Sequence, residues 1–246
     1  MLTIERKAAL LDRLARKGRL VAASLATEWG VSEDTIRRDL RDLAATGRLV
    51  RVHGGALPAS PTHLPLAKRA GLQRDAKARL GGAAASLIQT DMIVLMDGGT
   101  THLAIVAALP QSLRATIVTH SPGIAAALEQ HDRIDVILIG GRLFRHSMVA
   151  MGPTTQEALS RLRADLCFLG VTGVHPDLGL TTGDADEAVL KGTMIAAAEE
   201  TIVLATPDKI GMASPWLIAT LPQIDCLLTL EARPDWLPES VRHKSA

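Results

Sequence analysis

The chain has 246 residues, of which 47% are hydrophobic and only 2% aromatic, so it can bury one large aliphatic core or two unequal ones. No apolar run approaches the ~18 residues of a membrane-spanning helix, and no segment has the pattern of a secretory leader, so we expect a cytoplasmic protein. Residues 1–57 carry 11 Lys and Arg against 7 Asp and Glu, whereas the remainder carries 16 against 19. A basic N-terminal segment indicates a region that meets a polyanion.

Residues 3–47 predict three short helices, which end at the three glycines 18, 30 and 47. The apolar face of the first helix is expected to comprise Ile4, Ala8, Leu11 and Leu14. The third begins at the capping residue Ser32, and its apolar stripe is Ile36, Leu40 and Leu43. Because a tight turn at Gly30 separates the second helix from the third, the pattern indicates a helix-turn-helix.

The tetrapeptide GRLV follows a helix twice, at 18–21 and at 47–50, and RVHGG follows at 51–55. We interpret these segments as the strands of a small sheet in which Arg51 and His53 point outward. Residues 1–57 are therefore expected to form a winged helix-turn-helix.

The segment LPASPTHLPL at 57–66 contains three prolines and no charge, which is typical of a linker. We therefore divide the chain into a winged helix-turn-helix (1–57), a linker (58–66) and an α/β region (67–246). Apolar runs without polar alternation predict buried parallel strands at 92–96, 116–119, 135–139, 166–169, 201–205 and 225–230. Helices are expected at 74–88, 101–109, 122–130, 153–162 and 184–199.

Small and hydroxyl residues follow most of these strands, notably in the sequence DGGTT at 97–101. Ligands bind at the carboxyl ends of strands in an open parallel sheet, where free amides, hydroxyls and a cation make a phosphate site. The candidate residues in these loops are Asp97, Gly98, Gly99, Thr100, Thr101, Thr119, His120, Ser121, Gly141, Gly170 and Lys209. Dinucleotide and P-loop motifs and metal-ligand spacings are absent from the sequence, so we expect neither cofactor nor metal.

The stretch TTGDADEAVLK at 181–191 has two interpretations. Acids in the first turn stabilise a helix, and Glu187 and Lys191 form an i,i+4 pair. Alternatively, Asp184 or Glu187 accepts hydrogen bonds from the hydroxyls of a polyol, while Lys191 meets a phosphate.

Residues 31–56, VSEDTIRRDLRDLAATGRLVRVHGGA, closely resemble the signature of the DeoR family of bacterial transcriptional regulators. The segments DGGTT, IGGRL and GLTTGDADEAVLK resemble the effector domain of the same family. The resemblance implies a Rossmann-like, mostly parallel α/β domain, similar in fold to ribose-5-phosphate isomerase, that senses phosphorylated sugars or related metabolites. The side of the third helix opposite its apolar stripe is basic and suits DNA. The expected DNA contacts are Ser32, Thr35, Arg37, Arg38 and Arg41 on that helix, with Arg51 and His53 on the wing.

We therefore expect a repressor of a carbohydrate-utilisation operon whose binding to duplex operator DNA is controlled by a phosphorylated sugar. Helix-turn-helix proteins pair on two-fold operators, so we expect a homodimer or homotetramer. Two alternatives remain open. The acids at 184–187 could serve a sugar-phosphate isomerase fused to a DNA-binding domain, or the protein could be an architectural DNA binder without a ligand.

Overall fold

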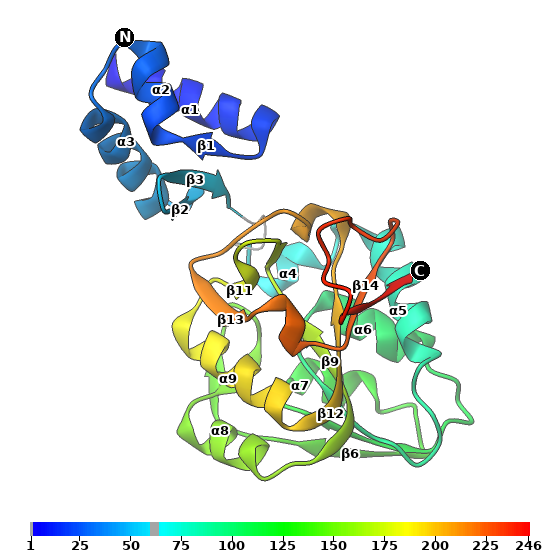
Figure 1. Cartoon of the computed structure of the whole chain (residues 1–246). Helices are drawn as coiled ribbons and strands as arrows, with labels where there is room; N and C mark the ends of the chain where they lie inside the picture. The colour runs from blue at the N-terminus through cyan, green and yellow to red at the C-terminus, as the bar shows by residue number, and fades with distance from the viewer. Residues whose placement is uncertain (1, 60–63) are drawn as a thin grey trace.

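The computed structural model describes residues 2–59 and 64–246, in which the chain forms a small winged helix followed by a larger α/β part (Figure 1). Residues 60–63 of the expected linker lie outside the described part. Of the rest of that segment, Pro58 ends a strand and Leu66 begins a short helix.

The winged helix contains three helices and a three-stranded antiparallel sheet. The helices are α1 (Thr3–Lys17), α2 (Ala22–Trp29) and α3 (Glu33–Ala45). The strands are β1 (Leu20–Val21), β2 (Leu49–Val52) and β3 (Gly55–Pro58), in the order β1-β3-β2. The predicted winged helix-turn-helix is thereby confirmed.

Local signals set the ends of α3 correctly, but the buried face of α1 was predicted only in part: Leu14 is buried and Leu11 packs against the core, whereas Ile4 and Ala8 are exposed. The Ser32 hydroxyl accepts a hydrogen bond from the Thr35 amide, and the expected stripe of α3 is buried. Helix α1 buries Arg6, Leu10 and Leu14, whereas Ile4 is 84% exposed. The reason lies outside the helix, because Arg6 forms a buried ion pair with Asp39 of α3 and so turns its own side of α1 inward.

The α/β part is built on a seven-stranded, entirely parallel sheet in the order β15-β14-β12-β9-β4-β5-β6. Its strands are β4 (Ile93–Met96), β5 (Ala115–Thr119), β6 (Ile134–Leu138), β9 (Ala164–Gly170), β12 (Ala198–Leu204), β14 (Cys226–Thr229) and β15 (Arg242–Ser245). The first six were predicted. The short, polar edge strand β15 was not, because it carries no apolar run.

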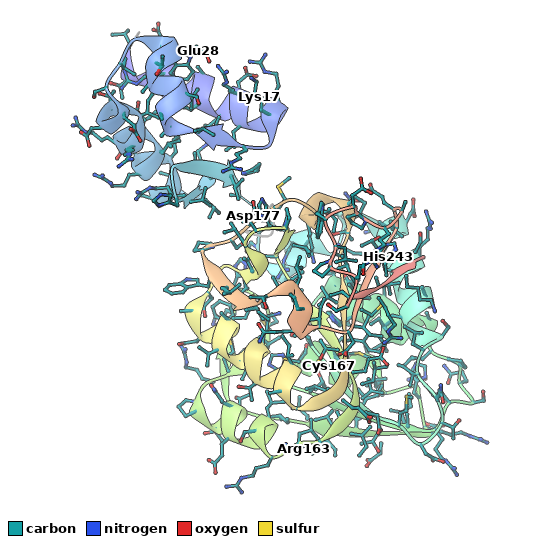
Figure 2. The ribbon with its side chains drawn as sticks, viewed as in Figure 1. Lys17, Glu28, Arg163, Cys167, Asp177 and His243 are labelled. Carbon is teal, nitrogen blue, oxygen red and sulfur yellow. The ribbon has the colours of Figure 1, made fainter. Side chains whose placement is uncertain are left out.

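Helices cover both faces of this sheet, which explains why its central strands are apolar without alternation. Leu95 packs with α8 (Pro153–Ser160) and α9 (Ala185–Ala196), whereas its neighbour Val94 packs with α5 (Arg74–Ala85), α6 (Thr100–Ala108) and α7 (Pro122–Ala127). Figure 2 shows Cys167 in the interior of this part of the molecule. The predicted helix 184–199 was too long at its end, because β12 already begins at Ala198.

Several short elements lie between the main strands and were not predicted. They are the hairpin β7 (Arg142–Phe144) and β8 (Val149–Met151), a sheet of β10 (Gly173–His175), β11 (Gly179–Thr182) and β13 (Trp216–Ala219), and the short helix α4 (Leu66–Arg69). Their strands pair antiparallel. No helix of the described chain is long and apolar enough to cross a membrane.

The winged helix touches the α/β part through the base of its wing. Val50 and Leu57 share a small buried cluster with Ala213, and Ala59 forms a parallel bridge with the same residue. Figure 2 shows Asp177 on the side of the α/β part that faces the winged helix. The wing is therefore in direct contact with the α/β part, as well as joined to it by the chain.

Two adjacent glycines of α5 provide a test of its packing. A Cβ atom on Gly81 would lie 2.5 Å from the backbone of Ala104 in α6, whereas one on Gly82 would meet nothing within 4 Å. We expect Gly81→Val to lower the free energy of unfolding by about 2 kcal/mol or more, because α5 and α6 must separate. Gly82→Val, the control on the same helix, should change it by less than about 1 kcal/mol. Equal effects in urea unfolding would show that the close approach of the helices is unimportant.

Candidate functional site

A cavity of about 520 Å³ opens at the carboxyl ends of β4 and β9. Chain segments far apart in sequence meet there, among them the loop after β4, the end of β9, the start of α9, the turn at Lys209, α4, the β7–β8 hairpin and the base of the winged helix. Most of the predicted ligand residues line it, namely Asp97, Gly98, Gly99, Thr100, Thr101, Gly170, Asp184, Glu187, Lys191 and Lys209.

Four predicted residues do not line this cavity and make internal contacts instead. The Thr119 hydroxyl donates to the Met96 carbonyl, and Ser121 caps α7 through the Ile124 amide. Gly141, at φ +156°, lies where a Cβ would collide with Thr155. His120 is fully buried beneath the cavity. These residues shape the loops around the cavity and are not exposed to its contents.

Asp97 is the centre of a buried polar network at the wall of the cavity. Its Oδ2 atom lies 2.5 Å from Lys191 Nζ and accepts the Gly170 amide at 2.9 Å. Its Oδ1 atom accepts the Gly98 amide at 2.7 Å and lies 3.0 Å from His120 Nε2. Lys191 Nζ also donates to the Gly170 carbonyl at 2.7 Å. One carboxylate thus ties together the ends of β4 and β9, helix α9 and the loop after β5.

Asp97 and Lys191 stabilise each other's charged forms. Burial would raise the pKa of Asp97, but Lys191 and the hydrogen bond from His120 outweigh it and hold that pKa well below its usual range. Burial would lower the pKa of Lys191, but Asp97 and then Glu187 raise it. Lys191 is therefore neutralised by Asp97, and the carboxylate of Glu187 is further away, at 3.8 Å. That Lys191 meets a phosphate stays a prediction, and its ammonium would bring little net charge to the cavity because Asp97 neutralises it.

The two acids at the start of α9, Asp184 and Glu187, also accept hydrogen bonds within the protein. Asp184 caps the helix by accepting the Glu187 amide at 3.0 Å, as the simpler interpretation predicted. Glu187 accepts a hydrogen bond from the Thr182 hydroxyl. Both line the cavity, so a hydroxyl-bearing ligand there would lie beside their carboxylates.

Lys209 and Arg69 are the two cavity cations for which the described chain provides no ion pair. Burial lowers the pKa of Lys209 to about 8, and Asp208, which raises it, does not compensate. Burial also lowers the pKa of Arg69, against the opposing effect of Glu187 and Asp97. The Arg69 Nε atom is buried and has no hydrogen-bond partner in the described residues. The cavity therefore holds positive charge that an anion would stabilise.

Sequence reasoning missed Arg69, His102, His146, Ser147, Thr172 and Ser214, all of which line the cavity. His102 lies on α6, and burial lowers its pKa to about 4, so its ring is neutral at pH 7. Its Nε2 atom is buried without a partner in the described chain. The only available signal for His102 was its place directly after the DGGTT loop.

The loop DGGTT presents the start of α6 to this cavity. Gly99 immediately precedes the helix at φ +126°, a conformation that favours glycine, and no side chain caps the helix. The first amides of a helix have no partners within it and favour negative charge. Amides, threonine hydroxyls and two uncompensated cations thus border one cavity.

The predicted DNA-contacting residues lie together on α3 and the wing. Ser32 and Thr35 share a hydrogen bond of 2.8 Å at the start of α3, where both side chains are near the surface. Arg37 pairs with Glu33 and Arg38 with Asp34, and Arg41 is exposed. A groove between α3 and the wing is lined by Arg37, Arg51 and His53. These exposed ion pairs are weak, so their arginines remain available to phosphates and bases.

The winged helix has a basic outer face, and the α/β part has a cavity whose amides and cations suit an anion. This combination is that of a ligand-sensing transcriptional regulator. The DeoR-like helix-turn-helix domain matches residues 6–62, and the DeoR C terminal sensor domain matches residues 72–230. The chain belongs to the DeoR family of DNA-binding transcriptional regulators.

Relatives match over nearly the whole chain. The HTH-type transcriptional regulator GlpR of Haloferax volcanii is 32% identical over 93% of this chain and 90% of the relative. The Glycerol-3-phosphate regulon repressor of Escherichia coli (strain K12) is 28% identical over 92% of this chain and 90% of the relative. The solved structure of ribose 5-phosphate isomerase A from Methanocaldococcus jannaschii is similar with a TM-score of 0.41 and 17% identity, over 56% of this chain and 54% of that one. No functional conclusion follows from a structural similarity at that level.

The buried pair of Asp97 and Lys191 leads to a prediction. Asp97→Asn should lower the free energy of unfolding by about 3–5 kcal/mol, because it leaves the Lys191 ammonium buried without a countercharge. The double variant Asp97→Asn/Lys191→Met should recover a substantial part of that loss, since it removes the stranded charge. Denaturant unfolding of the two single variants and the double variant measures the coupling. Strictly additive losses would mean that the two groups do not stabilise each other.

Proposed function

We propose that this regulator is a repressor of a carbohydrate-utilisation operon, released from or retained on its operator by a phosphorylated sugar or related metabolite. The observation that carries the proposal is the presence of two cations, Arg69 and Lys209, without an ion pair in the described chain, in the cavity that the start of α6 also lines. The Escherichia coli relative is named as the repressor of the glycerol-3-phosphate regulon, which supports a phosphorylated ligand.

The phosphate is expected at the start of α6. There the amides of Gly99, Thr100 and Thr101 meet it, together with the threonine hydroxyls. Arg69 supplies a fork of donors and Lys209 a point charge. The sugar hydroxyls then lie toward Asp184 and Glu187, which line the same cavity.

DNA binding and ligand binding are assigned to separate parts of the chain. Residues 1–57 bind DNA, with Arg37, Arg38 and Arg41 toward bases and phosphates and Arg51 and His53 along the wing. Residues 67–246 bind the ligand. Because helix-turn-helix proteins read two half-sites, the functional unit is at least a dimer.

The site supports binding rather than turnover. An aldose–ketose isomerase needs a carboxylate base that is free to take a proton from the substrate. Asp97 is committed to Lys191, His120 and two amides. Glu187 holds the Thr182 hydroxyl. We therefore propose that the protein has no isomerase activity and that its α/β part acts as a sensor.

The test of this function separates DNA binding from ligand binding in one set of titrations. An operator is first selected from random-sequence duplexes, and its affinity for the full chain is measured with and without phosphorylated and plain sugars. Arg38→Ala should weaken operator binding by about 1–3 kcal/mol and leave ligand binding intact. Lys209→Met should keep operator affinity and lose about 1.5–3 kcal/mol of ligand binding. Failure of every phosphorylated sugar to change operator affinity of the wild type would refute the proposal.

The pKa of Lys209 gives a second prediction, on proton uptake. At pH 8, about half of the ligand-free molecules carry a charged Lys209, because burial lowers its pKa to about 8. A bound phosphate dianion favours the ammonium and raises that pKa, so the complex takes up about half a proton at pH 8 and much less at pH 7. Calorimetry in two buffers of different ionisation enthalpy measures this uptake. Proton release at pH 8 would place the phosphate away from Lys209.

A further inference from the structure

Arg69 lies on the short stretch of chain between the two regions that match the family. The helix-turn-helix match ends at residue 62 and the sensor match begins at residue 72. We call residues 64–72 the connector; it contains α4 and follows closely after Ala59, which bridges to Ala213. A residue of the connector that contacts the ligand would join the cavity directly to the chain leading to the DNA-binding region.

The Arg69 side chain reaches the cavity that Asp97, Lys191 and Lys209 also line. Its Nε atom is buried and has no acceptor among the described residues. An arginine keeps its proton at any ordinary pH, so this buried Nε–H donor stays without an acceptor among the described residues of the ligand-free protein. A planar guanidinium fits two oxygens of a phosphate or carboxylate at once.

Hydrogen bonds fix the backbone of the connector, whereas the Arg69 side chain has no hydrogen bond to the described residues. Lys77 of α5 donates to the Arg69 carbonyl at 2.7 Å and to the Leu72 carbonyl at 2.5 Å. At the other end, the Leu66 amide donates to the His146 carbonyl at 3.0 Å, and His146 itself lines the cavity. These bonds fix α4 beside the cavity, so the guanidinium is presented to a ligand with little further ordering.

We propose that Arg69 binds the anionic group of the ligand, and that the connector carrying it transmits ligand occupancy to the DNA-binding region. This inference rests on the proposed function, since it names the residue that couples the same site to DNA. A ligand held by Arg69 favours the position of α4 seen here. Only residues 60–63 separate the connector from Ala59, so the position of α4 constrains where the wing can lie.

The experiment compares the full-length wild type with Arg69→Met, Arg69→Lys and the neighbouring control Lys68→Met. Lys68 is exposed on the same helix, so its loss changes the net charge equally without touching the cavity. The probes are inorganic phosphate, glycerol 3-phosphate, glucose 6-phosphate and fructose 6-phosphate, with glycerol, glucose and fructose as uncharged counterparts. Calorimetry gives the Kd of each probe, and thermal melting gives the stability of each ligand-free variant.

We expect Arg69→Met to weaken the tightest phosphorylated probe roughly 10- to 100-fold and Arg69→Lys by less, because the ammonium lacks the fork. Lys68→Met should bind as the wild type does. Ligand-free Arg69→Met should melt no lower than the wild type, since it removes a buried donor that has no acceptor among the described residues. At saturating probe, its operator affinity should respond less than that of the wild type.

Each contrary outcome has a separate meaning. Equal probe binding by wild type and Arg69→Met overturns this inference and leaves the proposed function standing. A clearly lower melting temperature of ligand-free Arg69→Met assigns the arginine a structural role instead. Weaker binding with a full operator response at saturation overturns the transmitting role. A wild type that binds no phosphorylated probe removes the proposed function, and this inference with it.

Discussion

The buried ion pair of Asp97 and Lys191 is the interaction on which the rest of the site depends. A lone charge at either position would be strongly unfavourable, so the two residues require each other. Through the amides of Gly98 and Gly170 the same carboxylate fixes the loop after β4 against the end of β9. The open start of α6 is thereby held in one place, and a ligand meets a preformed surface.

Because this pair is internally neutral, recognition of an anion passes to other cations. Lys209 and Arg69 stand at the cavity without ion-pair partners in the described chain, and burial lowers the pKa of both. The site therefore has two layers with different tasks. Asp97 and Lys191 neutralise each other and fix the shape of the cavity. Arg69 and Lys209 have no ion-pair partner in the described chain without a ligand, and this favours the binding of an anion.

The sequence predicted what depends on neighbouring residues and missed what depends on distant ones. The six apolar strands and the capped helix α3 carry local signals, namely buried runs and the Ser32 cap. Strands β15 and β13 form by pairing with segments further away along the chain, β14 and β11 respectively, whereas β10 and β11 form a local hairpin whose strands are too short to give an apolar run. The predicted i,i+4 pair of Glu187 and Lys191 is present at 3.8 Å, but the closer partner of Lys191 is Asp97, 94 positions away, for which no local spacing gives a signal. Arg69 was missed because it lies between the predicted linker and the first predicted helix, in a stretch without a local pattern that would place α4 beside the cavity.

The base of the winged helix completes the cavity from above, which bears on how a ligand could act. Its contribution consists of Ala44, Gly47, Leu49 and Val50, none of which carries charge. These residues can exclude water from a ligand but cannot bind its phosphate. A ligand changes an equilibrium only by binding two states with different affinity. Here the two states would differ in whether the base of the wing covers the ligand and in whether the connector holds Arg69 against it. The residue whose charge binds the ligand, Arg69, therefore follows residues 60–63 in the chain, and the apolar wing base that would cover the ligand precedes them.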